Sequence, residues 1–318
     1  MTAVLVTGGT GTFGRAVVDA LLSKGSTRRV VVFSRDEQKQ DAMRKSMPCD
    51  DRLRFFLGDV RDESRLRMAM RDINIVLHAA AMKIVPSCEY DPIECIKTNV
   101  VGAMNVISAA ISSSSVEGVV ALSTDKAAAP ANLYGASKLS AERLFISANN
   151  LSGEGGPRFS VARYGNVSGS RGSVIPLWRA LAEERKPLPI THEEMTRFWI
   201  TVPDAVSFVL DAVVFQQGGE IFIPKMPSYR IVDLAAAICG GANFDRKIVG
   251  VRPGEKLHED LITVHEAENA TQNDHAYVIC PPWLAPGLPL PKGFSLTSAN
   301  NADRMSIDRI KERLPYVE

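Results

Sequence analysis

The chain has 318 residues, of which 45% are hydrophobic and 23% charged, a composition typical of a globular protein that folds around its own core. Its 37 basic and 36 acidic residues leave a net charge of +1, which offers no overall field to attract nucleic acid or an acidic membrane surface. No apolar run approaches the ~20 residues that span a bilayer, and the N-terminus lacks the pattern of a signal peptide. We therefore expect neither nucleic acid nor a membrane as a partner.

Cysteine and histidine usage narrows the expected chemistry. The five cysteines are scattered and include no C-x-x-C pair, which indicates reduced thiols and favours a cytoplasmic location. None of the five histidines stands in a metal-binding spacing, so we predict no metal site.

The first half of the chain alternates short apolar runs with longer amphipathic stretches. The predicted strands lie at residues 3–7, 30–34, 53–58, 74–79, 118–123 and 158–164. Between them, hydrophobic residues at three- and four-residue steps predict helices at about 12–24, 36–46, 62–71, 92–111 and 132–149. This order predicts an α/β fold, a Rossmann-like doubly wound parallel sheet with helices on both faces.

After Tyr164 the elements become shorter and less regular, and glycine, proline and charged residues become more frequent. A helix at about 203–215 and a strand at 220–223 have the pattern of elements that return to the main sheet. The rest of this half predicts a smaller lobe that closes over the carboxyl ends of the strands. The predicted division is 1–165 with about 199–240 for the Rossmann-like domain, and 166–198 with 241–318 for the smaller C-terminal lobe.

A glycine-rich turn follows the first predicted strand and opens the first helix. Gly8, Gly11 and Gly14 stand in a G-x-x-G-x-x-G spacing, which lets the backbone approach a pyrophosphate at the positive end of a helix. The place of this turn between a strand and a helix favours a dinucleotide site over an ordinary glycine turn. The predicted cofactor contacts here are Gly8, Thr10, Gly11, Thr12, Phe13 and Gly14.

The end of the second strand bears on the choice between NAD and NADP. An acidic residue there would accept the ribose 2′-hydroxyl and repel a 2′-phosphate, whereas this chain reads Ser34 and Arg35. Arg35 can pair with a phosphate, Ser34 can donate to it, and Lys39 can add charge. Against this, Asp36 could take the ribose, and Ser34 could merely cap the next helix. We predict NADP.

Two later strand ends complete the predicted cofactor site. Asp59 and Val60 follow the third strand, where they would meet the adenine. Ala79, Ala80 and Ala81 follow the fourth strand and provide small side chains where a cofactor must pass closely.

A candidate catalytic group follows the fifth strand. Thr124, Asp125 and Lys126 end this strand, and Tyr134 and Lys138 follow in a Y-x-x-x-K arrangement. Positions i and i+4 share one face of a helix, so Lys138 can stand beside Tyr134 and lower the phenol's pKa from its usual ~10. We predict that Tyr134 and Lys138 also contact the cofactor.

Further motifs follow in order along the chain: Ser123–Ala127, Asn132–Lys138, Arg163–Val167, Ser170–Val174, Thr196–Ile200 and Arg252–His258. By these motifs the chain resembles the extended short-chain dehydrogenase/reductases, and within them the inverting UDP-N-acetylglucosamine 4,6-dehydratases of the polysaccharide-biosynthesis branch. The last three motifs distinguish this branch from sugar epimerases, and Lys126 stands where related glucose dehydratases carry glutamate. One departure is Ile84, where relatives usually carry histidine.

The resemblance implies removal of water from a UDP-linked N-acetylhexosamine by tightly bound NADP that is regenerated in each turnover. Tyr134 would take the proton of the sugar 4-hydroxyl while hydride passes from C4 to the cofactor, and Thr124 would hold that oxygen. Lys126, if neutral, would remove the C5 proton, and Asp125, if protonated, would protonate the departing 6-hydroxyl. Burial shifts both pKa values in the needed direction, whereas a direct Asp125–Lys126 ion pair would oppose both shifts and indicate a structural role.

The substrate's diphosphate needs cations in the smaller lobe. Arg171 and Arg252 are the predicted partners, because a guanidinium binds phosphate oxygens with two hydrogen bonds. Asn166 lies at the crossing between the lobes and can hydrogen-bond the substrate. The remaining predicted contacts are Lys83, Arg197 and Glu255. Lys83 could equally be a solvated loop residue and Arg197 a structural ion pair, and the resemblance further implies a homo-oligomer.

Two other functions stay open at this point. A UDP-sugar 4-epimerase shares Thr124, Tyr134 and Lys138 but stops after redox at C4, and the presence of Asp125 and Lys126 argues against it. A non-catalytic NADP-sensing protein of the same fold would not need the threonine, tyrosine and lysine together.

Overall fold

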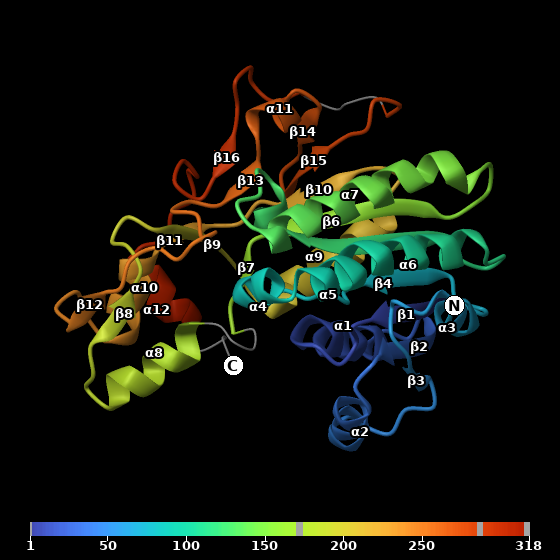
Figure 1. Cartoon of the computed structure of the whole chain (residues 1–318), viewed down its shortest axis with the longest axis horizontal. Helices are drawn as coiled ribbons and strands as arrows, with labels where there is room; N and C mark the ends of the chain where they lie inside the picture. Colours follow the sequence, from blue (N-terminus) through green and yellow to red (C-terminus); the bar gives the residue numbers. More distant parts are fainter. Residues whose placement is uncertain (1, 170–173, 285–288, 315–318) are drawn as a thin grey trace.

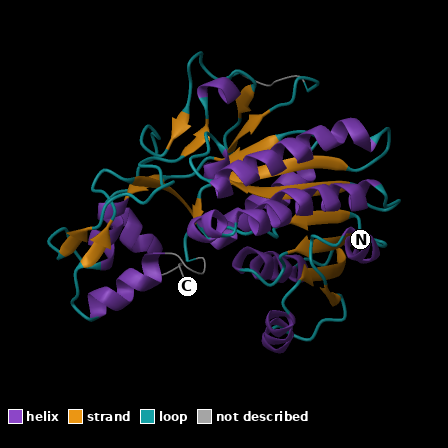
Figure 2. Ribbon diagram, in the orientation of Figure 1, coloured by secondary structure: helices purple, strands orange, loops and turns teal. Residues whose placement is uncertain are grey.

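The structure, a computed structural model, describes residues 2–169, 174–284 and 289–314, and its largest feature is a nine-stranded sheet within these ranges (Figures 1 and 2). In spatial order its strands are β14 (Ala270–Gln272), β15 (Ala276–Ile279), β10 (Ile221–Pro224), β6 (Arg158–Tyr164), β5 (Gly118–Thr124), β4 (Ile75–His78), β1 (Thr2–Thr7), β2 (Thr27–Ser34) and β3 (Leu53–Leu57). From β10 to β3 all neighbours are parallel, while β15 and β14 add an antiparallel edge. The predicted α/β class with a doubly wound parallel sheet is confirmed.

The central strands form because their residues suit burial on both faces. Every residue of β5 from Gly118 to Ser123 is buried, and β6 is buried from Phe159 onward. Such continuous Val-, Ala- and Leu-rich runs are typical of parallel strands with helices on both sides.

Two layers of helices cover this sheet, and some of these helices start at a side-chain cap. On one face α1 (Thr12–Ser23) packs against α9 (Val202–Phe215), and on the other α6 (Gly102–Ile111) packs between α3 (Glu63–Ala69) and α7 (Leu133–Ser152). Side chains of Asp36, Asp62 and Asn132 accept hydrogen bonds from the first turns of α2 (Glu37–Ser46), α3 and α7.

The helix predicted at 92–111 is interrupted in the structure. It consists of α5 (Pro92–Ile96), one π-helical turn (Lys97–Val101) and α6, and a short helix, α4 (Val85–Tyr90), precedes it. Hydrophobic spacing cannot predict such a π-turn, because one inserted residue shifts the face of the helix without interrupting its apolar character.

A second core lies beside the sheet and includes the large buried side chains Trp178, Trp199 and Tyr229. Its strands form a three-stranded sheet, in the order β11 (Ser228–Arg230), β9 (Thr196–Ile200) and β7 (Asn166–Val167). They also form a two-stranded sheet of β12 (Arg246–Ile248) and β8 (Leu188–Ile190). Its helices are α8 (Val174–Glu183), α10 (Ile231–Ile238) and α12 (Ile307–Arg313). A second two-stranded sheet, β13 (Asp260–Ile262) with β16 (Leu296–Thr297), and the short α11 (Val264–Ala267) lie nearer the large sheet.

The second half of the chain passes between the two cores more often than the predicted division into 199–240 and 241–318 implies. β14 and β15, from the segment 241–318, extend the large sheet, whereas β11 and α10, from the segment 199–240, pack in the second core. Apolar spacing identifies a buried face without identifying the element that covers it, so the division into two lobes stays a prediction.

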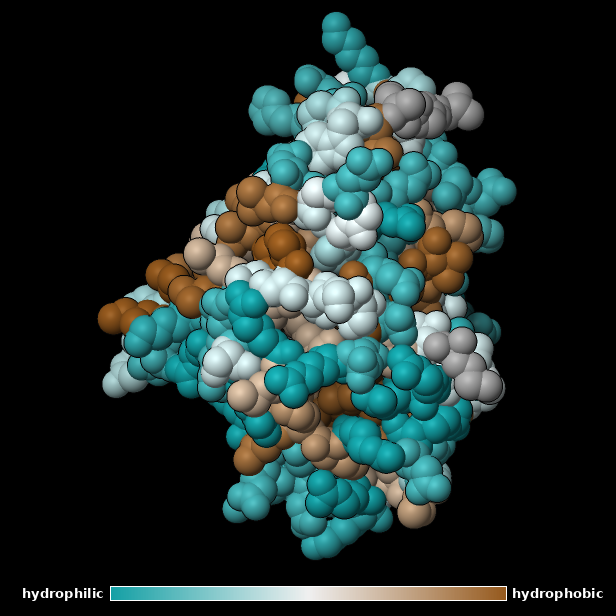
Figure 3. Space-filling model, turned by 90° about the vertical axis from the view of Figure 1, so that its right-hand side faces the viewer, coloured by the Kyte–Doolittle hydropathy of each residue, from teal (hydrophilic) through white to brown (hydrophobic). Residues whose placement is uncertain are grey.

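No helix among the described residues is both long and apolar enough to cross a membrane. Hydrophilic side chains cover most of the face that Figure 3 shows, and the apolar ones lie between them in separate groups.

Candidate active site

One cavity of about 990 Å³ lies at the carboxyl ends of the parallel strands and continues between the two cores. It is lined by the ends of β2 and β5 and by the residues that follow β1 and β4 on one side, and by Trp199, Tyr229 and Arg252 on the other. All predicted site residues line this cavity except Arg171, which lies outside the described residues. The positions therefore come together, while their roles stay predictions.

The glycine turn forms a backbone cradle that fits a pyrophosphate. Gly8 has a φ of +66°, and a Cβ there would lie 2.8 Å from the backbone nitrogen of Ala80, so no side chain fits between β1 and β4. Gly11 is the N-cap of α1 and has no side-chain cap, which leaves the first N–H groups of the helix directed at the cavity. These donors and the helix dipole match a dinucleotide.

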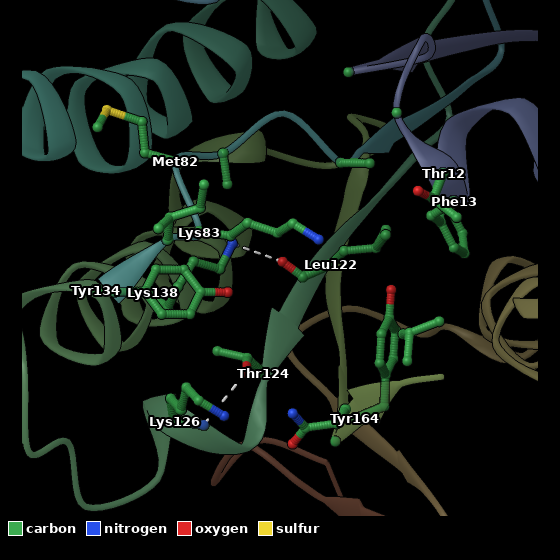
Figure 4. A pocket seen from close by; sticks show the side chains of 18 of the residues that line it. Thr12, Phe13, Met82, Lys83, Leu122, Thr124, Lys126, Tyr134, Lys138 and Tyr164 are labelled. Carbon is green, nitrogen blue, oxygen red and sulfur yellow. Dashed lines mark hydrogen bonds between the residues drawn. The ribbon is translucent and has the colours of Figure 1, made fainter. Parts of the chain in front are cut away.

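The π-helical turn adds a feature that sequence analysis missed. Thr98 lines the cavity, and its buried Oγ1 has no hydrogen-bond partner among the described residues. Next to it, Asn99 bonds the backbone of Met82 through both side-chain atoms, at 2.8 and 2.9 Å. This pair fixes the loop that carries Lys83 at the wall of the cavity (Figure 4).

At the end of β2 the acidic residue is engaged elsewhere. Asp36 accepts a hydrogen bond from the backbone of Lys39 and pairs with its ammonium at 2.9 Å. Asp36, not Ser34, is thus the cap of the next helix, and the Ser34 hydroxyl accepts from Gln40. Arg35 has a side chain 59% exposed and reaches Asp59 only at 3.8 Å, which leaves its guanidinium available.

Tyr134 and Lys138 lie one turn apart at the start of α7, where the helix packs closely on the chain after β5. A Cβ on Gly135 would lie 2.2 Å from the carbonyl oxygen of Lys126, so only glycine lets these segments meet. Lys138 Nζ donates to the carbonyl of Leu122 at 2.7 Å, and Figure 4 shows it beside the Tyr134 ring at the cavity wall. Tyr134, Thr124 and Lys126 therefore share one small region.

Burial dominates the titration of this pair. It raises the pKa of Tyr134 to about 12, and the charge of Lys126 and a hydrogen bond with Thr124 offset it only in part. Burial also lowers the pKa of Lys138 to about 8. The protein's own groups thus keep the phenol protonated at neutral pH, and the lowered value expected from Lys138 needs a further positive charge at the site.

Lys126 lies between two buried carboxylates. Its Nζ is 3.1 Å from Asp125 Oδ1 and 3.0 Å from Glu259 Oε1. Burial lowers the pKa of Lys126, but these two carboxylates outweigh burial and hold it above its usual range. Burial raises the pKa of Asp125, and the opposing effect of Lys126 is smaller. The direct ion pair is therefore present, and it reverses the expected shift for Lys126 but not for Asp125.

Sequence analysis missed Glu259, although it directly follows the Arg252–His258 motif. No local signal could have found it, because Glu259 and Asp260 both precede the apolar pair of β13 and the pattern does not tell which of the two is buried.

The side chains predicted to contact the substrate differ in how strongly they already bond to other protein groups and in how exposed they are. Arg197 donates to the backbone of Thr196 at 2.7 Å, pairs with Glu255 at 3.1 Å and reaches Glu259 at 3.6 Å. Arg252 is exposed at the cavity edge, and Asn166, in β7, is exposed inside it. Arg252 is thus more available to a diphosphate than Arg197 is.

Comparisons with known proteins agree with this picture. Residues 4–281 match the family model described as polysaccharide biosynthesis protein. The UDP-N-acetylglucosamine 4,6-dehydratase (inverting) of Campylobacter jejuni is 50% identical over 281 residues, 87% of this chain and 82% of that protein. A UDP-glucose 4-epimerase of Rickettsia bellii is 42% identical over equal shares, 87% and 82%. The X-ray structure of Pen from Bacillus thuringiensis is similar with a TM-score of 0.91 and 35% identity, covering 99% of this chain and 97% of that one.

Proposed function

The chain belongs to the polysaccharide biosynthesis protein family, and from this we infer that it converts UDP-N-acetylglucosamine to a UDP-4-keto-6-deoxy-N-acetylhexosamine with inversion at C5. The observation that carries this function is the juxtaposition of Asp125 and Lys126 with Thr124 and Tyr134 in one cavity. Redox at C4 alone needs only the tyrosine and its partners, whereas loss of water across C5 and C6 needs a further acid and base.

We propose that a nicotinamide dinucleotide binds at the glycine turn, since the uncapped start of α1 fits its pyrophosphate and solved structures of this fold contain NAD. When bound, it accepts a hydride from C4 of the sugar and returns it to C6. We propose NADP in particular, because Arg35 is free to pair with a 2′-phosphate while Asp36 is occupied by Lys39. Thr98 is a further candidate contact.

Tyr134 and Thr124 act on the sugar 4-hydroxyl. Tyr134 removes its proton as the phenolate, which forms once a further positive charge at the site offsets burial. Thr124, whose Oγ1 donates to Asp125 at 3.0 Å, is close enough to hold the same oxygen. Lys138 stabilises the phenolate by its charge.

Asp125 and Lys126 then act on C6 and C5. The 4-ketone acidifies the C5 proton, which the Lys126 amine removes, and Asp125 gives its proton to the departing 6-hydroxyl, which leaves as water. Asp125 is fully buried, which favours the protonated form that this step requires. Lys126 must first release the proton that its two carboxylates hold.

Arg252 binds the diphosphate and Asn166 the sugar in this proposal, because both are exposed at the cavity. A homo-oligomer and a cytoplasmic location also belong to the proposal, the first on the resemblance and the second on the cysteine pattern.

An NMR time course with UDP-N-acetylglucosamine and NADP⁺ in heavy water tests this function. We expect a 6-deoxy-4-keto product with deuterium at C5 and with ring couplings that report inversion. Unchanged substrate in the presence of bound cofactor would contradict the proposal.

The similarity to a named UDP-glucose 4-epimerase supports one alternative. In that case the same time course, run with UDP-glucose as well, would give a C4 epimer that retains its 6-hydroxyl and its C5 hydrogen.

A further inference from the structure

Glu259 is a buried carboxylate to which the proposed reaction assigns no part. It is 1% exposed, and its Oε1 accepts from Lys126 at 3.0 Å and lies 3.6 Å from Arg197 Nε. Glu259 directly precedes β13, in the second half of the chain, and its partner Lys126 follows β5 in the first half. A carboxylate is costly to bury, and this one contacts the proposed C5 base directly.

Asp125 competes with Glu259 for the same ammonium, and the geometry favours Glu259. Lys126 Nζ is almost equidistant from the two, at 3.1 and 3.0 Å, but within the described residues an arginine reaches only Glu259. Burial opposes ionisation of Glu259, yet Lys126 and Arg197 together hold its pKa below the usual range. Asp125 has one cation, and the negative charge of Glu259 helps burial to raise its pKa.

The other groups around Asp125 do not compensate for this difference. Tyr134 from α7 and Tyr229 from β11 are the other titratable side chains that interact with it, and burial raises both pKa values, so both are neutral. Thr124 donates to Oδ1, while Oδ2, like Glu259 Oε2, has no partner among the described residues. A Cβ on Gly165 would lie 2.4 Å from Phe198 Cβ and 3.3 Å from Oδ2, so only glycine lets the chain pack this closely beside that oxygen.

We propose that Glu259 is a positioning residue that takes the counter-charge of Lys126 and thereby leaves Asp125 protonated as the acid for the 6-hydroxyl. Two carboxylates around one lysine then have separate tasks, since like charges at this distance favour one ionised and one protonated group. With Asp125 neutral, Lys126 faces a single carboxylate, and the charge of Arg197 eases the loss of its proton. This inference rests on the proposed function.

The Glu259→Gln variant tests it, because glutamine keeps the size and one hydrogen bond but removes the charge. Asp125 then becomes the carboxylate that neutralises Lys126, and it loses its proton at lower pH. We expect the alkaline fall of kcat to move down by about one pH unit or more, with KM nearly unchanged. We also expect reduced nicotinamide to accumulate after substrate is added, because C4 is oxidised while elimination is slow.

Asp260→Asn is the matched control. Asp260 is the next residue, and its carboxylate pairs with Lys256 at 2.7 Å instead of Lys126. Its pH profile should match that of the parent protein, and so should its spectrum during turnover.

The outcomes separate this inference from the function beneath it. A parent protein that makes no keto sugar overturns both, whereas an active parent with an unchanged pH profile in Glu259→Gln overturns this inference alone. If Glu259→Gln does not fold, Glu259→Asp keeps the charge but retracts it. That variant should show a smaller shift in the same direction, and no shift would again overturn the inference.

Discussion

Two buried ion clusters in this protein contain the same kinds of side chain and differ in how completely they are hydrogen-bonded. In the first, the Arg163 cluster, Arg163 donates two hydrogen bonds to Glu142, at 2.9 and 2.6 Å, and two to Glu266, at 3.1 and 2.8 Å. A fifth goes to the carbonyl of Leu261 at 2.9 Å. The guanidinium is thus saturated and does not line the cavity.

The second, the Lys126 cluster, consists of Asp125, Lys126, Arg197 and Glu259 and leaves two buried oxygens without partners among the described residues, Asp125 Oδ2 and Glu259 Oε2. Three of its members line the cavity, whereas Glu259 lies behind them. A cluster whose hydrogen bonds are all made holds elements of the fold together. A cluster at a cavity with unused hydrogen-bonding capacity can exchange protons with a substrate. The comparison predicts that changes in the first cluster affect stability and changes in the second affect chemistry.

The largest effect is expected from Lys126→Ala. Loss of the C5 base should reduce product formation by about a thousandfold or more, and the C5 hydrogen should no longer exchange with solvent. The NMR time course in heavy water measures both. The folded state should persist, because the variant leaves Glu259 paired with Arg197. Exchange at C5 that continues in this variant would remove Lys126 from the role of base.

Arg163→Met should lower the stability of the folded protein and leave its activity nearly unchanged. It leaves Glu142 and Glu266 buried without their cation, which costs about 3–5 kcal/mol in the free energy of unfolding. Denaturant unfolding gives this value, and activity per folded molecule should stay within a few fold.

Arg158→Met on the same strand is the control, since Arg158 is exposed and bonds one carbonyl, that of Gln216, at 3.1 Å. It should change the free energy of unfolding by about 0.5 kcal/mol or less. Equal losses in the free energy of unfolding in the two variants would mean that the Arg163 cluster contributes no more to stability than an exposed arginine does.

The sequence predicted one of these clusters in part and the other not at all. Asp125 and Lys126 were visible because they directly follow an apolar strand, and the order of parallel strands places such ends at one edge. Glu259 and Thr98 were not, because one depends on how a distant segment packs and the other on a π-turn. Glu142 and Glu266 reach Arg163 from two helices, α7 and α11, and no local spacing relates the three.

A third buried group, His78, sharpens the comparison because it is accommodated without charge. Burial, followed by the charge of Lys138, lowers its pKa to about 3, and its Nδ1 lies 2.9 Å from Thr7 Oγ1. Since the folded value is below the unfolded ~6.5, the unfolded chain binds the proton first as pH falls. Stability should be complete above pH ~6.5 and should decrease by about 2 kcal/mol between pH 6.5 and 5.

The check is denaturant unfolding at several pH values for the parent protein and for His78→Gln. Glutamine does not titrate, so the difference between the two curves should narrow as pH falls through this range. Parallel curves would show that His78 takes up its proton over the same pH range in the folded protein as in the unfolded chain.

The smallest effect is expected at Arg35, whose charge is exposed and whose nearest carboxylate in the described part of the chain is 3.8 Å away. In Arg35→Ala the dissociation constant for NADP⁺ should rise about tenfold while that for NAD⁺ stays within a factor of about two, because only the 2′-phosphate loses a partner. Titration of cofactor-free protein with each nucleotide measures this, and Lys45→Ala, an exposed charge on the same side of the fold that pairs with Asp41, is the control. The change at Arg35 is smaller because solvent screens an exposed ion pair, whereas Lys126→Ala removes the C5 base itself. A parent protein that binds NAD⁺ more tightly than NADP⁺ would contradict the proposed cofactor, and equal losses for both nucleotides would place Arg35 on the shared part of the dinucleotide.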